Sequence, residues 1–359
     1  MKKTIAWFLV LLFAALYTFA SYGDFKNTIA FRNKSNSVFG SDKYKFGDLF
    51  GISYYPLIKQ NLRETKQIIP VENPAVGKKI NLCLAHDSYL GKDFLASKAQ
   101  IGSADTIYDL EYPWFRGKAN TAVVLDTSKT NVLVFEIVER NLFRLDKNAA
   151  LNLVNLATAN ENPVPISEMK TVKKKSKFKQ YKEIIFNTRI NKNLEFLLFD
   201  VRLFTPIKEL KSYINYTFFN RLPPEVFISE NQKQEYISDV KTSIEDKITV
   251  AETEKMVSLL NEIHDFYKNK GFDKVYFSIV PNPVAIIKPE ALRYNNLIPM
   301  IQNSPNLRMP MIDIYTDFKK CDADLYFFSD THWNRDGFTL WINKFNAILN
   351  ADLSSDKNG

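Results

Sequence analysis

Three nearly continuous apolar runs limit the folds open to this chain more strongly than any other feature. They are KINLCLA (79–85), VLVFEIV (132–138) and KVYFSIV (274–280), and a polar loop follows each of them. A strand with one wet face alternates apolar and polar side chains. A strand of a parallel sheet is apolar throughout, because helices cover both of its faces. With helical segments between the runs, the pattern predicts an α/β fold of three layers with a mainly parallel sheet.

Local signals place the elements around these strands. Thr249 and Glu252 have the spacing of a capping box, and the helix that they begin carries apolar residues at helical spacing up to Tyr267. We expect another helix from about Lys92, a short strand in DLYFF (324–328), and a final helix over about 337–350.

The N-terminus has the composition of an export signal. Lys2 and Lys3 precede an apolar run over 5–20. The run is short for a spanning helix, which needs roughly 17–25 residues, and TFA (18–20) is a small-x-small cleavage pattern. A cleaved signal and a retained anchor both fit segment 1–23, and we favour the anchor. The protein is therefore expected to be exported, either periplasmic or held on the extracytoplasmic face of a membrane by its N-terminal helix.

The remaining chain is expected to divide into three segments. Residues 24–150 form the first part of the α/β domain, 151–246 form an inserted helical and aromatic subdomain, and 247–359 form the second part. The insertion holds seven lysines in 170–182, which either form a solvated loop, the interpretation that we favour, or contact anionic lipid or acidic polysaccharide. The aromatic residues of 194–222 form ordinary core or face a membrane. Although the net charge is +8, we do not expect nucleic acid as a partner, because the protein is expected to be exported.

Cysteine chemistry is limited to two residues. Cys83 and Cys321 are the only cysteines, and they either form a disulfide or leave Cys83 as a buried free thiol. The CxxC spacing of many metal sites is absent.

Polar clusters stand in three loops that follow predicted strands. They are His86-Asp87-Ser88 (86–88), Glu139-Arg140-Asn141 (139–141) and Asp330-Thr331-His332 (330–332). In open α/β sheets the chemistry gathers beyond the carboxyl ends of the strands. We therefore expect the three clusters to lie close together.

The residue types in these loops suit nucleophilic catalysis by a serine. Ser88 is the candidate nucleophile, His332 the base that takes its proton, and Asp330 the carboxylate that orients the imidazole. An oxyanion also needs donors; the candidates are the backbone N–H of Ser88, the side chains of Arg140 and Asn141, and a backbone N–H near Gly102. His86 is either a pocket residue that binds substrate or a buried histidine. Trp333 either packs beneath the loop, the interpretation that we favour, or forms a platform that binds a sugar.

Other interpretations of the same residues remain open. Ser88 is also a helix N-cap by type, and Arg140 could form a structural ion pair with Glu139 or another carboxylate. Two imidazoles and two carboxylates would suit zinc or a similar ion; these are His86, Asp87, Asp330 and His332. We favour the serine mechanism, with no metal and no cofactor.

Four motifs resemble the SGNH (GDSL-like) hydrolase superfamily. They look most like its DHHW-type branch that O-acylates envelope polymers, which includes the alginate O-acetylation proteins and the protein required for teichoic-acid D-alanylation. The motifs are HDSYL (86–90), VFEIVERN (134–141), VPNP (280–283) and SDTHWNRDG (329–337). The similarity covers most of 45–350 apart from the insertion, and only the DTHW block is specific.

The resemblance implies Ser88 as nucleophile, His332 as general base and Asp330 as its partner. It also implies a membrane-bound O-acyltransferase that delivers the acyl group. Two features depart from the pattern: His86 stands where the family has glycine, and the Asp-His block follows the serine block, whereas in the alginate proteins it precedes it.

These features predict an exported SGNH-like serine acyltransferase or esterase, which O-acetylates a cell-envelope polysaccharide or exopolysaccharide through an acyl-enzyme on Ser88. Transfer and hydrolysis share every residue up to the last step. The alternative is a non-catalytic envelope protein that keeps the fold and binds polysaccharide or a membrane acyltransferase.

Overall fold

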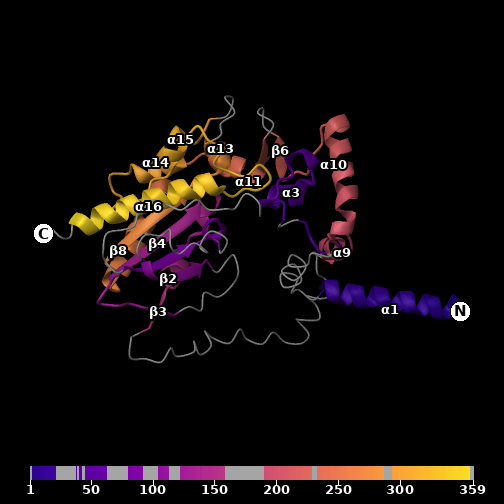
Figure 1. Cartoon of the computed structure of the whole chain (residues 1–359), viewed down its shortest axis with the longest axis horizontal. Coiled ribbons are helices and arrows are strands. Elements are labelled where there is room, and N and C mark those ends of the chain that lie inside the picture. The colour runs from indigo at the N-terminus through magenta and orange to yellow at the C-terminus, as the bar shows by residue number, and fades with distance from the viewer. Residues whose placement is uncertain are drawn as a thin grey trace. The chain divides into compact units, whose positions relative to one another are not determined.

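The computed structural model describes ten stretches of the chain: 2–21, 38, 40–42, 45–62, 80–91, 104–112, 122–157, 190–228, 233–286 and 293–355. The chain divides into two compact units (Figure 1). The first contains 1–61 and 166–223, and the second contains 62–165 and 224–359. The predicted insertion, 151–246, is thus shared between the units, and its role as an insertion stays a prediction. The predicted helix at Lys92, the backbone near Gly102 and the lysine run 170–182 lie outside the described residues.

The second unit is built on a sheet of four parallel strands. In spatial order they are β2 (Ala104–Glu111), β1 (Ile80–His86), β4 (Thr130–Val138) and β8 (Lys274–Val280). The three apolar runs of the sequence form the three strands β1, β4 and β8. The prediction of an α/β fold with a mainly parallel sheet is confirmed.

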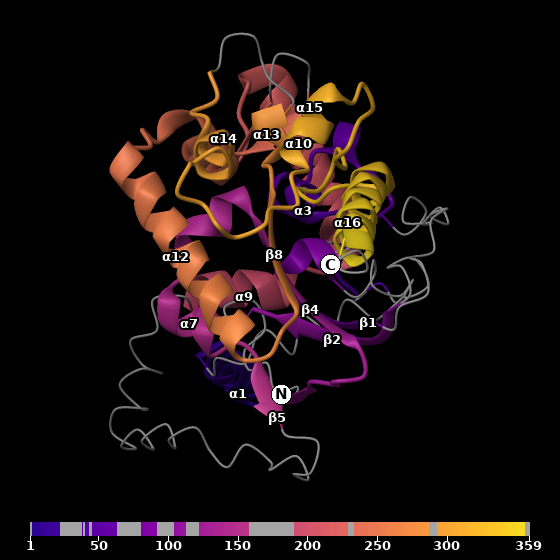
Figure 2. The same ribbon diagram turned by 90° about the vertical axis from the view of Figure 1, so that its left-hand side faces the viewer.

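Each face of this sheet has its own hydrophobic core. Along β4, Leu133 and Phe135 belong to one core, and Val132 and Val134 belong to the other. Helix α12 (Val250–Asn269) supplies the first core, and helix α16 (Arg335–Ser355) supplies the second (Figure 2). Burying one such aliphatic or aromatic side chain contributes about 1.5–3 kcal/mol. This covering on both sides explains why the strands are apolar throughout.

Helix α12 begins as its sequence predicts. The Thr249 hydroxyl accepts from the backbone N–H of Glu252 at 3.2 Å, and the Glu252 carboxylate accepts from the backbone N–H of Thr249 at 2.9 Å. The final helix is also confirmed, and as α16 it is longer than predicted.

The structure differs from the predicted strands at two places. Strand β2 was not predicted, because it is an edge strand with polar, half-exposed side chains and lacks a continuous apolar run. The segment 324–328 does not join the sheet and pairs only through an isolated antiparallel bridge between Tyr326 and Trp333. Leu325, Tyr326 and Phe327 are buried in the second core from a loop, whereas Phe328 is exposed, so burial there does not require a strand.

Shorter elements complete the second unit. They are a 3-10 turn η2 (Ser88–Leu90), β3 (Ala122–Val124), η4 (Glu139–Arg144), α7 (Lys147–Leu151), β5 (Asn155–Ala157), β6 (Val226–Ile228), β7 (Gln234–Tyr236), α11 (Ile237–Val240), a π-helical turn η6 (Lys241–Glu245), α13 (Pro283–Ile286), α14 (Leu297–Gln302) and α15 (Tyr315–Lys320). Cys83 and Cys321 are free thiols in the structure, and burial raises the pKa of Cys83.

The first unit is helical where it is described. It contains α1 (Lys2–Ser21), α3 (Asp48–Ser53), η1 (Pro56–Ile58), α9 (Ile190–Phe199), η5 (Arg202–Phe204) and α10 (Thr205–Phe219). Helix α1 has 20 residues and a mean hydropathy of 2.0 in its most apolar window. Within the described part of the chain it is the one helix long and apolar enough to cross a membrane, a property that signal sequences share.

Candidate active site

Ser88 lies in a tight turn at the carboxyl end of a central strand. Strand β1 ends at His86, and the turn η2 begins at Ser88. Between them, the Asp87 carboxylate accepts a hydrogen bond from the backbone N–H of Tyr89 at 3.0 Å, which caps the turn. The N-cap of this turn is therefore Asp87, and Ser88 is its first residue.

Asp87 also connects this turn to the neighbouring strand β4 through a hydrogen bond. Its second carboxylate oxygen accepts from the backbone N–H of Val138, at the end of β4, at 2.8 Å. The side-chain amide of Asn141 lies 3.5 Å from the same oxygen. Asn141, a predicted oxyanion donor, is thus placed against Asp87, where it supports the Ser88 turn.

The loop that carries His332 is closed by its own backbone. The N–H of Phe327 donates to the carbonyl of His332 at 3.1 Å, and the N–H of Asn334 donates to the carbonyl of Leu325 at 2.9 Å. Trp333 is fully buried, and its indole N–H donates to the Tyr89 carbonyl at 3.0 Å. As the sequence predicts, Trp333 packs beneath the loop, and it also joins the loop to the Ser88 turn.

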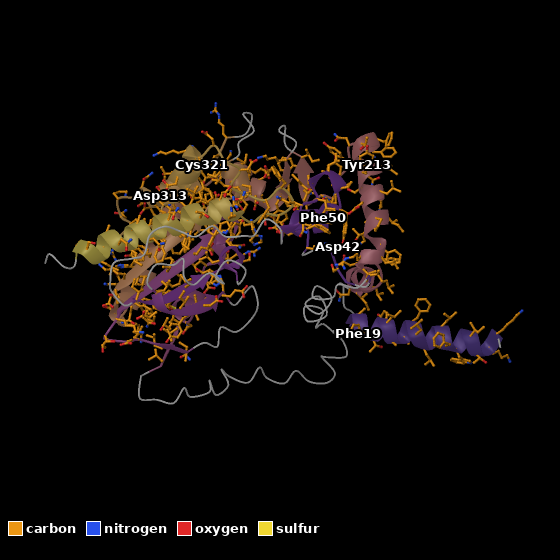
Figure 3. The ribbon with its side chains drawn as sticks, viewed as in Figure 1. Phe19, Asp42, Phe50, Tyr213, Asp313 and Cys321 are labelled. Carbon is orange, nitrogen blue, oxygen red and sulfur yellow. The ribbon has the colours of Figure 1, made fainter. Side chains whose placement is uncertain are left out.

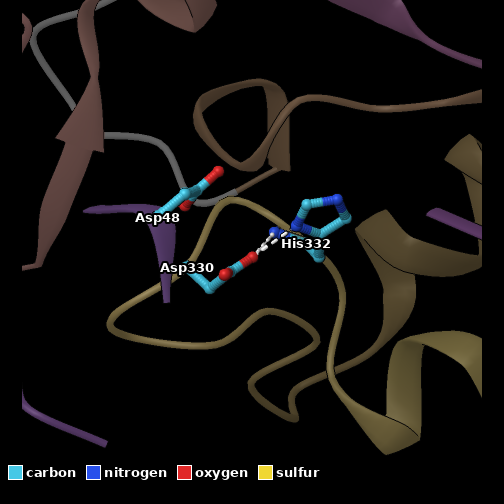
Figure 4. Close-up of side chains that lie close together, drawn as sticks. All are labelled: Asp48, Asp330 and His332. Atoms are coloured by element: carbon cyan, nitrogen blue, oxygen red, sulfur yellow. Dashed lines mark hydrogen bonds and ion pairs between the residues drawn. The ribbon is translucent and has the colours of Figure 1, made fainter. Parts of the chain in front are cut away.

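These contacts bring His332 between Ser88 and Asp330. The Nε2 atom of His332 lies 2.8 Å from the Ser88 hydroxyl oxygen. On the other side of the ring, Nδ1 is hydrogen-bonded to the Asp330 carboxylate, which also accepts from the backbone N–H of His332 at 2.9 Å (Figure 4). The His332 side chain is 23% exposed, and that of Asp330 is 10% exposed. The imidazole is thus held in place and still open to solvent.

The direction of these hydrogen bonds follows from the groups that make them. An ionised carboxylate can only accept, so the proton of the neutral imidazole lies on Nδ1, facing Asp330. Nε2 then has a free lone pair for the hydroxyl proton of Ser88. This arrangement of nucleophile, base and orienting carboxylate is the one that activates a serine.

Arg140 connects both halves of this arrangement. Its guanidinium donates to the Tyr89 hydroxyl at 3.1 Å, to the Asp239 carboxylate at 3.2 Å and to the Thr331 hydroxyl at 3.2 Å. Tyr89 follows Ser88, and Thr331 precedes His332. Of the two roles considered for Arg140, these contacts provide the structural ion pair, with Asp239 as the partner. Arg140 therefore links the Ser88 turn to the His332 loop.

His86 has a set of contacts separate from those that join His332 to Ser88 and Asp330. It is buried, its Nε2 pairs with Asp109 of β2, and its Nδ1 lies 2.5 Å from the backbone carbonyl of Asp87. Burial lowers the pKa of His86, but these hydrogen bonds outweigh it, and the pKa is raised above 6.5. Because both ring nitrogens face oxygens of β2 and the Ser88 turn, the four-residue metal arrangement is not assembled among the described residues.

Two buried glutamates support the carboxyl ends of the strands. Burial and the Asp87 charge raise the pKa of Glu136 well above 4.5, and Glu136 accepts from the backbone N–H of Asp87 at 3.3 Å. Glu139 accepts from the backbone N–H of Asn282 at 3.0 Å and from the Tyr294 hydroxyl at 2.9 Å. Burial raises the pKa of Glu139 to about 7 despite these bonds.

The raised pKa of Glu139 predicts a pH dependence of stability. Glu139 holds its proton more tightly in the folded protein than in the unfolded chain. The stability that protonated Glu139 contributes is therefore complete below pH 4.5 and is lost as the pH rises to about 7. Over this range the free energy of unfolding should fall by on the order of 1–3 kcal/mol more in wild type than in Glu139→Gln. Chemical unfolding, followed by the fluorescence of the buried Trp333 and Trp341, measures this difference. Parallel pH curves for the two proteins would contradict the prediction.

Gly337 permits a close approach between α16 and the His332 loop. A Cβ atom at this position would lie 2.5 Å from the Leu325 carbonyl oxygen and 2.8 Å from the Trp333 Cβ. Both neighbours belong to the loop that the backbone bonds close, so the loop must shift if a side chain is added.

We therefore expect Gly337→Ala to destabilise the second unit by about 1–3 kcal/mol through overpacking. For a serine esterase, a shift of about 1 Å at Ser88 or His332 would also lower the hydrolysis rate by on the order of a hundredfold. Asn343→Ala, at an exposed position of the same helix, is the control and should change neither. Chemical unfolding and ester hydrolysis measure the two effects, and unchanged values in Gly337→Ala would show that the loop accommodates a methyl group.

Sequence reasoning missed much of the network around the cluster. Tyr89 and Asp239 were not singled out, and Thr331 was named in the 330–332 cluster without a role of its own. Glu136 falls within an apolar run, and a single acidic residue in such a run was the available signal.

Comparisons with known proteins add no relative to this geometry. No protein-family model, no curated protein and no solved structure was found to match the chain.

Proposed function

We propose that the chain is an exported serine acyltransferase or esterase with Ser88 as its nucleophile. One observation carries the proposal: the His332 imidazole contacts the Ser88 hydroxyl through Nε2 and the Asp330 carboxylate through Nδ1. A structural histidine needs one satisfied nitrogen. A histidine that activates a serine has a carboxylate on one ring nitrogen. Its other nitrogen faces the hydroxyl whose proton it takes, at a place that substrate can reach.

The first half-reaction would acylate Ser88. The serine oxygen attacks the carbonyl carbon of an acyl ester while His332 Nε2 takes the hydroxyl proton. The backbone N–H of Ser88 is the candidate donor to the oxyanion. As the tetrahedral intermediate collapses, the bond to the leaving alkoxide breaks, and His332 returns the proton to that alkoxide. The acyl group is then held on Ser88 as an ester.

The second half-reaction would reverse these roles. An acceptor hydroxyl, or water, loses its proton to His332 and attacks the acyl-serine carbonyl. Collapse of this intermediate gives the acylated acceptor, or the free acid, and Ser88 recovers its proton. The motif resemblance favours acetyl transfer to a sugar hydroxyl of an envelope or exported polysaccharide, with a membrane-bound O-acyltransferase as donor. Helix α1 would tether the enzyme as its anchor.

A fluorophosphonate probe tests this proposal, because it reacts with activated serines and barely with ordinary ones. We expect the wild-type chain to be labelled on Ser88, Ser88→Ala to remain unlabelled, and Ser128→Ala, which removes an exposed surface serine, to be labelled as wild type. Equal labelling of wild type and Ser88→Ala would contradict the assignment of the nucleophile.

A further inference from the structure

Helix α10 of the first unit has an exposed apolar face. The site formed by Ser88, His332 and Asp330 does not account for it. Ile207, Leu210 and Phe218 are 64%, 59% and 71% exposed, and Ile214 between them is exposed too. These residues are spaced by three or four positions, so they lie on one face of the helix. Figure 3 shows the large side chains along this helix and labels Tyr213 among them.

The opposite face of α10 is turned toward its own unit and holds polar residues together with Tyr216, whose ring centroid lies 4.8 Å from that of Tyr55. Ser212 is buried. Lys208 Nζ lies 3.4 Å from the Asp200 carboxylate, and Glu209 pairs with Lys59 at 2.5 Å. A surface helix of a water-soluble protein places its apolar stripe toward the core and its charges toward water. On α10 the apolar stripe is instead exposed, and Lys208 and Glu209 form ion pairs within the unit. An exposed apolar patch of this kind marks a surface that contacts another protein or a membrane.

The properties of helix α1 indicate that this surface contacts a membrane. It belongs to the same unit, its length and hydropathy suit a membrane, and its large apolar side chains are exposed. Its last residues, Ala20 and Ser21, are buried, and the Asn193 amide of α9 donates to the Ala20 carbonyl at 2.9 Å. Helix α9 leads through η5 into α10. A membrane crossed by α1 would therefore end close to α10, and Figure 1 shows α10 running crosswise to α1.

The charges of α10 fit the surface of a bilayer. Its charged residues are Lys208, Glu209 and Lys211. The first two form the ion pairs within the unit, and Lys211 is exposed. A lysine beside an apolar face can extend its ammonium group to lipid phosphates while its methylenes stay among the acyl chains.

We infer that α10 lies in the interface of a lipid bilayer, with its apolar face toward the acyl chains and α1 as the spanning helix beside it. The unit is then held on the membrane at two places, which restricts its rotation about α1. This inference does not depend on the chemistry of Ser88.

Site-specific photocrosslinking of the full-length chain in vesicles of phosphatidylethanolamine and phosphatidylglycerol tests it. The photoreactive amino acid p-benzoylphenylalanine replaces Leu210 or Ile214, and in the control it replaces Ser258, an exposed residue of α12. We expect phospholipid adducts, identified by mass, at 210 and 214 and none above background at 258. Adducts to a second copy of the chain, or no adduct at 210 and 214, would overturn the inference.

A second variant tests the face as a whole. Leu210→Asp combined with Ile214→Asp changes two exposed side chains, and α1 keeps the chain in the vesicles. With the photoreactive amino acid at position 218, lipid adducts should be lost in this variant and retained without the two substitutions. Adducts that persist unchanged would contradict a bilayer-bound apolar face.

Discussion

Replacing Asp330 with asparagine is expected to slow the acylation of Ser88 by about three to four orders of magnitude, while the fold is retained. The asparagine amide can donate to Nδ1 of His332, which moves the imidazole proton to Nε2. Nε2 then has no lone pair for the Ser88 proton. The backbone N–H of His332 donates to the same Asp330 oxygen at 2.9 Å. An amide nitrogen in that place therefore also removes this loop hydrogen bond, at a cost of about 0.5–1.5 kcal/mol.

Pre-steady-state acylation by an aryl acetate ester measures this effect. His332→Ala should lose a similar factor, and the double variant should lose little more, because residues that act as one unit are not additive. Unfolding free energies that fall by no more than the cost of one hydrogen bond, about 0.5–1.5 kcal/mol, exclude a general loss of structure. A rate for Asp330→Asn within about tenfold of wild type, where three orders of magnitude are expected, would remove Asp330 from the mechanism.

The second large effect is expected at Arg140. Arg140→Ala removes the hydrogen bonds to Tyr89, Asp239 and Thr331 together. Asp239 is fully buried, and its ion pair with Arg140 is largely buried. Breaking a buried pair by removing one partner typically costs about 3–5 kcal/mol. We expect a loss of this size in the free energy of unfolding, together with a large loss of acylation rate, because the Ser88 turn and the His332 loop lose their common partner.

A paired substitution separates the two losses. Arg140→Met combined with Asp239→Leu removes both charges, so most of the stability should return, as it does when apolar residues replace buried ion pairs. The acylation rate should stay low, because neither new side chain can bind Thr331 and Tyr89. Full recovery of the rate would mean that Arg140 acts through stability alone.

The sheet was predictable because its strands are covered on both faces. Leu133 and Val134 point to different cores and are equally buried, so β4 reads as a continuous apolar run. The edge strand β2 carries Asp105 and Asp109 and gives no such pattern. The segment 324–328 is as apolar as a strand, yet it packs as a loop. Hydropathy reports burial, and burial alone does not distinguish these two states.

The site was predictable where it follows from topology. Ser88 and Arg140 follow adjacent parallel strands, so their proximity follows from the sheet itself. The loop of His332 follows no strand of the sheet, and its place depends on contacts such as that of the Trp333 indole with the Tyr89 carbonyl. The partner of Arg140 was not predictable, because Asp239 comes from the short helix α11, within a segment whose pattern suggested an insertion. Long side chains find partners according to tertiary packing, which a one-dimensional pattern does not contain.

The central claim, that Ser88 forms an acyl-enzyme, is tested most directly by intact-mass analysis after incubation with an activated acetyl ester. Wild type and Ser88→Ala are compared side by side, with unfolding curves to show that both are folded. We predict one acetyl adduct on wild type, mapped to Ser88, and none on Ser88→Ala. The absence of an adduct on folded wild type, or an equal adduct on both proteins, would contradict the account and favour a non-catalytic envelope protein that keeps the cluster only as part of its fold.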